Sequence, residues 1–148
     1  MAIIVRGILA VAAGLGFAVF LILVVEGIGF KIVPEPELPK FDEPGFEAAR
    51  DDYMANPPLL PTLFFPFSWL VGTAAATAAA RRVASGNSPM PGHVAEGLLL
   101  LAGVWMLQSQ MIPNPIWMWV VGIAAFPIGG YIGASLAAPR VKNSNSDG

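Results

Sequence analysis

The sequence predicts an all-α integral membrane protein, a four-helix transmembrane bundle with a Pro-rich acidic outer loop that contains a short helix. Four apolar stretches cover about residues 7–28, 62–80, 94–112 and 115–138. At a rise of ~1.5 Å per residue, each stretch can cross a hydrocarbon core of about 30 Å. Only two charged residues, Glu26 and Glu96, fall inside these stretches, and both lie near stretch ends.

The composition agrees with this fold class and excludes several kinds of function. Hydrophobic residues make up 55% of the chain and charged residues 12%, whereas soluble domains average roughly 25% charged residues. The absence of cysteine excludes disulfides and thiolate metal sites, and a single histidine cannot supply a multi-histidine site. Because basic residues form no cluster, nucleic acid is not an expected partner. We expect no metal and no cofactor.

The first span, 7–28, is predicted to be a retained transmembrane helix rather than a signal peptide. Only Arg6 stands in its N-terminal region. The apolar run is also much longer than the roughly 7–15 residues of a signal-peptide core.

The outer loop covers residues 29–61 and is predicted to begin with an extended, proline-rich piece. Asp42 is expected to cap a short helix that follows. In that helix Phe46, Ala49 and Tyr53 are spaced so that they share one apolar face.

The three remaining spans complete a single membrane domain, residues 1–148. An inner loop, 81–93, follows the second span, and a short hairpin at Asn114 joins the third span to the fourth. The tail, 139–148, is polar and predicted to be disordered.

The positions of the basic residues predict the orientation in a bacterial inner (cytoplasmic) membrane. Arg6 precedes the first span, Arg81 and Arg82 follow the second, and Arg140 and Lys142 follow the fourth. Cytoplasmic segments carry an excess of Lys and Arg, so both termini are predicted to be cytoplasmic. The acidic loop would then face outward.

Small residues recur at helical spacing in three spans and predict close helix packing. The packing candidates are Gly7, Gly14, Gly72, Ala76, Gly129 and Gly133. These stripes could join two copies of the chain in a homo-oligomer, or they could pack the four helices of one bundle together. The sequence leaves both alternatives open.

Polar residues near the ends of the spans are the candidates for function, because ionisable groups are costly in a bilayer. One group falls on the outer side and could line a polar pocket: Glu26, Tyr53, Gln108, Gln110 and Asn114. The alternative is a hydrated Glu26 with amides that cap helix ends. On the inner side, Arg81 and Arg82 are predicted to form an ion pair with Glu96.

The features along the chain resemble those of a widespread group of uncharacterised small bacterial four-transmembrane-helix proteins. They are a first helix that ends near Glu26, the loop prolines Pro57 and Pro58, and the hairpin 111–117. The related hairpins tend to carry His where this chain has Asn114. The resemblance implies the fold and no activity.

Two functions remain in view, and neither is enzymatic, because no catalytic constellation is recognisable. The first is a structural or accessory component of the membrane, as a homo-oligomer or in a larger membrane complex, with the lipid bilayer as its other partner. The second is a small transporter or a lipid- or hydrophobe-binding protein that uses the outer polar pocket.

Overall fold

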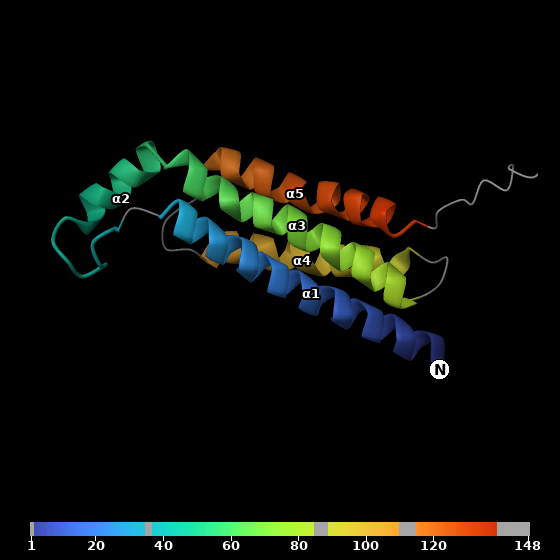
Figure 1. Cartoon of the computed structure of the whole chain (residues 1–148). Helices are drawn as coiled ribbons and strands as arrows, with labels where there is room; N and C mark the ends of the chain where they lie inside the picture. The colour runs from blue at the N-terminus through green and yellow to red at the C-terminus, as the bar shows by residue number, and fades with distance from the viewer. Residues whose placement is uncertain (1, 35–36, 85–88, 110–114, 139–148) are drawn as a thin grey trace, which may run out of the picture.

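The computed structural model describes residues 2–34, 37–84, 89–109 and 115–138, and these residues form five helices and no strand (Figure 1). The helices are α1 (Ala2–Ile32), α2 (Phe46–Ala55), α3 (Leu59–Ala84), α4 (Met90–Ser109) and α5 (Ile116–Leu136). All but α2 are long and apolar enough to cross a membrane. The predicted all-α fold with four such helices is therefore confirmed.

The four long helices run up and down beside one another, and α3 lies at their centre (Figure 1). Helix α3 packs against α1, α5 and α4, whereas α1 and α5 do not come within contact of each other. One end of the bundle carries Arg6, Arg81 and Arg82 and is called here the arginine end. The opposite end, from which α2 extends, is called the loop end.

Glycines bring α3 close to both of its flanking helices. A Cβ added to Gly14 of α1 would lie 2.7 Å from the backbone oxygen of Ala76, and one added to Gly129 of α5 would lie 2.6 Å from that of Leu70. Gly133 meets the backbone oxygen of Ala74 in the same way. Backbones can approach this closely only where no side chain separates them.

The centre of the bundle is filled by two aromatic rings. Trp69 of α3 and Phe126 of α5 are stacked with ring centroids 5.6 Å apart, and both are almost fully buried. Gly103 of α4 lies against the Phe126 ring, and Gly122 of α5 lies against the Trp69 ring. The glycines thus make the space that the rings occupy.

Helices α1 and α3 extend beyond the apolar stretches that predicted them, whereas α5 lies within the predicted 115–138. Helix α1 starts at Ala2 rather than near residue 7, and α3 starts at Leu59 rather than near residue 62. Hydropathy marks the part of a helix that suits hydrocarbon, while the backbone hydrogen bonds continue into polar surroundings. Pro61 and Pro91 stand in first turns, where a missing N–H breaks no helical hydrogen bond.

The predicted Asp42 cap of α2 is wrong. The helix begins later, after Gly45, whose φ of 92° lies in the left-handed region, and Gly45 provides no side-chain cap. Glu43 instead accepts a hydrogen bond from the backbone N–H of Lys40, which tightens the turn before the helix. Glycine can occupy this position because it adopts positive φ without steric cost.

Candidate functional site

Glu26 is held by α3, through a residue that the sequence did not single out. Ser68 Oγ donates to Glu26 Oε1 over 2.9 Å, and the Ser68 side chain is fully buried. The same hydroxyl lies 2.8 Å from the backbone oxygen of Phe65, one turn earlier. Glu26 is therefore part of the α1–α3 interface at the loop end.

Two other members of the predicted outer pocket, Gln108 and Tyr53, do not line the gap beside Glu26. Gln108 is exposed on α4, and Tyr53 is half-buried on α2. The gap beside Glu26 has no room for a water molecule and is lined by α1, α3 and the segments next to them. Gln110 and Asn114 lie outside the described residues. The described part of the chain thus forms no open polar pocket at Glu26.

The arginines at the arginine end bind helix carbonyls rather than Glu96. Arg81 Nη1 donates to the backbone oxygen of Ala134 over 3.1 Å, and Arg82 Nη2 donates to that of Leu136 over 3.1 Å. Arg6 Nε donates to the backbone oxygen of Val83 over 3.3 Å. The last carbonyls of a helix lack partners and carry negative dipole charge, so cationic side chains stabilise them.

Glu96 has a different partner from the one predicted. Its Oε2 lies 3.4 Å from Nδ1 of His93, one turn earlier on α4, and its carboxylate packs against Gly130 of α5. Among the described residues no ion pair joins Glu96 to Arg81 or Arg82. Arg81 and Arg82 do not pair with Glu96 because both side chains reach toward the end of α5 instead.

The small residues that predicted close packing lie largely inside the bundle. Gly14 and Ala76 meet at the α1–α3 contact, Gly72 lies against Ile22, and Gly129 and Gly133 lie against α3. Gly7 is the exception, with open space where its Cβ would be. Most of these positions are therefore occupied within one chain.

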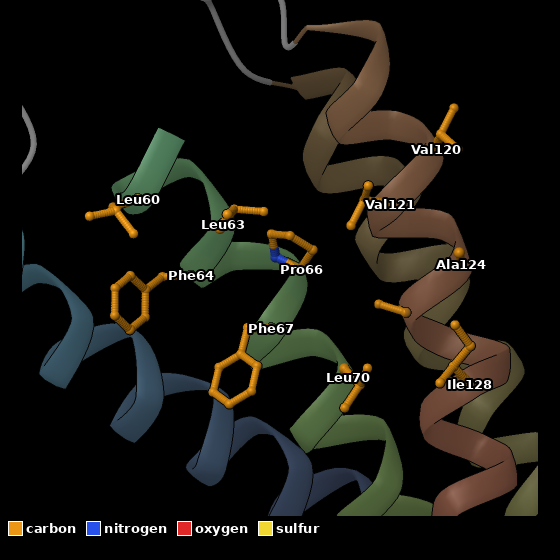
Figure 2. A pocket seen from close by; sticks show the side chains of 11 residues that line it. Leu60, Leu63, Phe64, Pro66, Phe67, Leu70, Val120, Val121, Ala124 and Ile128 are labelled. Carbon is orange, nitrogen blue, oxygen red and sulfur yellow. The ribbon is translucent and has the colours of Figure 1, made fainter. Parts of the chain in front are cut away.

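Two apolar hollows lie along α3 and together are called here the α3 groove: one toward the loop end, between α3 and α5, and one toward the arginine end, where α1 also contributes. Its loop half has a volume of about 650 Å³. Figure 2 shows Leu63, Pro66 and Leu70 of α3 opposite Val121 and Ala124 of α5. Pro66 contributes a ring without a polar N–H to this wall.

The arginine half of the α3 groove has a volume of about 400 Å³. Phe17 and Leu21 of α1 form one wall, and Ile132 and Leu136 of α5 form the other. The floor consists of α3 residues, mostly alanines, and includes Arg82 near the end of the helix: Leu70, Val71, Ala74, Ala75, Ala78, Ala79 and Arg82. Leu70 lines both halves.

Sequence reasoning missed Ser68 and the α3 groove. Ser68 is a polar residue in the first half of the second span, opposite an acid at the end of the first, and that pairing was available as a signal. The alanine run 74–80 was visible too, but it could not show that one side of α3 is left uncovered. Comparisons with protein-family models, with curated proteins and with solved structures each found no match.

Proposed function

We propose that the protein is a multi-pass component of the bacterial inner membrane that acts as a structural or accessory partner in a larger membrane assembly. Four long apolar helices support insertion. Arginines at one end of the bundle and acids at the other support cytoplasmic termini and an outward loop. The partner is a second membrane or envelope protein, bound through the loop end.

Helix α2 is the observation that carries this proposal. It has only ten residues, none of them buried, and it packs against none of the four long helices. Isolated helices shorter than about 12–15 residues are marginal in water. A helix so little supported by its own bundle gains stability when its apolar side is covered by another molecule.

The segment before α2 provides an apolar side that a partner can cover. The rings of Phe41 and Phe46 meet edge to face, with centroids 5.3 Å apart, and Phe41 is 73% exposed. Residues 41–55 are called here the α2 arm. Its acids, among them Glu47 and Asp52, are exposed and favour a partner with basic groups around an apolar patch.

Photocrosslinking in native membranes tests the proposal. A photoreactive phenylalanine at Phe41 is expected to give a protein adduct of one defined mass, which mass spectrometry identifies. The same amino acid at Trp105, exposed on α4, is the matched control and is expected to give lipid adducts.

Native mass spectrometry in mild detergent supplies the second readout. The adduct partner is expected to co-purify, and Phe41→Asp is expected to weaken that complex without changing expression. A monomer without partners, together with lipid adducts from both crosslinking positions, contradicts the proposal.

A further inference from the structure

The arginine half of the α3 groove has the shape of a site for one extended hydrocarbon chain. Its floor is made mainly of alanines, while Phe17 and Leu21 on one side and Ile132 and Leu136 on the other stand higher. Because α1 and α5 do not contact each other, no part of the four-helix bundle covers this floor. In a bilayer the groove would open toward the acyl chains of one leaflet.

The positively charged side chain of Arg82 lies where the groove reaches the arginine end. Arg82 is part of the groove lining and donates one hydrogen bond, from Nη2 to Leu136. A guanidinium has five N–H donors, and within the described part of the chain this bond engages one of them. Long basic side chains near helix ends reach toward the headgroup level.

Arg6 adds a second charge on the same side. It precedes Phe17 by eleven residues, which is about three helical turns, so both project from the same side of α1. Its Nε bonds to Val83, the residue after Arg82, and this contact brings Arg6 to the end of α3. Two guanidinium groups thus lie at the end of α3, and one of them, that of Arg82, lines the groove.

The acid at this end does not face the groove. Glu96 packs against Gly130 on the α4–α5 side and lies beside His93. Among the described residues, then, the groove lining contains no carboxylate that would neutralise Arg82. The described part of a second copy of this chain offers no exposed acid at the same depth, which argues against a homodimer through this groove.

We propose that the arginine half of the α3 groove binds one anionic phospholipid, with an acyl chain along the alanine floor and the phosphate on Arg82 and Arg6. Phosphate oxygens match the donor geometry of guanidinium groups. Basic sites between transmembrane helices on the cytoplasmic side suit anionic headgroups. The site requires the proposed membrane insertion but not the partner at the α2 arm.

Lipid titration followed by native mass spectrometry tests the headgroup. Protein purified in dodecyl maltoside is titrated with dioleoylphosphatidylglycerol or dioleoylphosphatidylcholine. One phosphatidylglycerol per monomer is expected, bound at least about fivefold more tightly than phosphatidylcholine, since one basic residue near an anionic surface contributes about that factor. Equal binding of the two lipids overturns the proposal.

Neighbouring arginines supply a matched pair of variants. Arg82→Gln is expected to weaken phosphatidylglycerol binding about fivefold, and Arg82→Lys is expected to keep most of it. Arg81→Gln removes the same charge one residue away, from a side chain that bonds to Ala134 and does not line the groove. Equal losses of phosphatidylglycerol affinity in Arg81→Gln and Arg82→Gln would show that binding depends on overall charge, and would contradict a specific site at Arg82.

The acyl-chain contact is tested by filling the floor. Ala75→Leu is expected to weaken lipid binding, while Ala102→Leu, on the exposed face of α4, leaves it unchanged. Both variants are compared by helical circular dichroism and elution volume, so that misfolding is recognised. Unchanged binding in a folded Ala75→Leu protein overturns the groove as the site, whatever crosslinking shows at the α2 arm.

Discussion

Ser68 and Glu26 show how a single carboxylate is accommodated near the end of a long apolar helix. The hydroxyl of Ser68 is fully buried and directed at both Glu26 and the carbonyl of Phe65. Its one proton serves two acceptors in surroundings that hold few other polar groups. Removal of the hydroxyl leaves the carboxylate without its described partner, which costs more than the loss of an exposed hydrogen bond.

Ser68→Ala is therefore expected to lower the free energy of unfolding in detergent by about 1 kcal/mol. Ser109→Ala is the matched control, because Ser109 is exposed and bonds within α4, to Met106. Unfolding followed by circular dichroism during titration with sodium dodecyl sulfate measures both. Equal stabilities of the two variants would show that the Ser68–Glu26 contact contributes nothing.

At Gly133 the backbone of a neighbouring helix leaves no room for a side chain. An added Cβ would overlap the backbone oxygen of Ala74, and that atom cannot move without shifting α3. Gly133→Ala is expected to destabilise the bundle by about 1–3 kcal/mol through overpacking. Gly97→Ala adds the same methyl group on α4 in open space and is expected to be neutral or stabilising.

Thermal unfolding of the two variants in the same detergent provides the measurement. If Gly133→Ala unfolded at the same temperature as the wild-type protein, α5 and α3 could move apart without a loss of stability, which would contradict the prediction. The glycine stripe was recognisable from its spacing, but its partner helix was not. The spacing shows that another helix can approach closely, but it does not show which helix does so.

At the scale of elements, α2 is the least supported helix. It depends on a glycine turn at its start and has no buried residue. The sequence predicted a short helix with Phe46, Ala49 and Tyr53 on one face, and the structure has a helix over these residues. The start was mispredicted because Asp42 and Gly45 are both plausible starting points, and only the path of the chain selects between them.

Gly45→Ala is expected to loosen α2 and leave the bundle intact. The space around Gly45 is open, so the cost arises from its positive φ, about 1–2 kcal/mol for a residue with a Cβ. Hydrogen exchange of the α2 amides is expected to become about 5- to 30-fold faster, because each 1.4 kcal/mol is a factor of ten in an equilibrium. Gly27→Ala, a helical glycine in open space, is the control. Unchanged α2 exchange in Gly45→Ala would contradict a role for this turn.

Helix α3 organises the other elements because its side chains are small on several sides. The alanine and threonine run 74–80 lets α1, α5 and α4 approach one axis. Three neighbours cannot surround a helix completely, and the side between α1 and α5 stays open as the α3 groove. The small residues of the sequence predicted close packing but not that α3 is central, and which side of α3 is uncovered depends on how the other three helices are placed.

At the scale of the whole molecule, arginines at the arginine end contribute both to the stability of the bundle and to its predicted orientation in the membrane. Arg6, Arg81 and Arg82 bond to backbone oxygens at the ends of α3 and α5. These three arginines, which help to predict cytoplasmic termini, therefore also stabilise helix ends, so their loss would affect both properties.

Single-cysteine labelling tests the predicted orientation, and a chain without cysteine is suited to it. Asp52→Cys, on α2, is expected to react with a membrane-impermeant maleimide on intact spheroplasts. Ala138→Cys, at the arginine end, is expected to react only after permeabilisation. The reverse pattern would place the acidic loop in the cytoplasm and contradict the proposed topology.

The sequence by itself determined the class of fold, because the hydrocarbon thickness and the cost of buried charge limit what four long apolar stretches can form. It also located the charges at the ends of those stretches. Only the tertiary structure decided the partners: Ser68 for Glu26, helix carbonyls for Arg81 and Arg82, and an open groove along α3. Hydropathy is a property of each helix alone, whereas a contact depends on the rotation and depth of two helices at once.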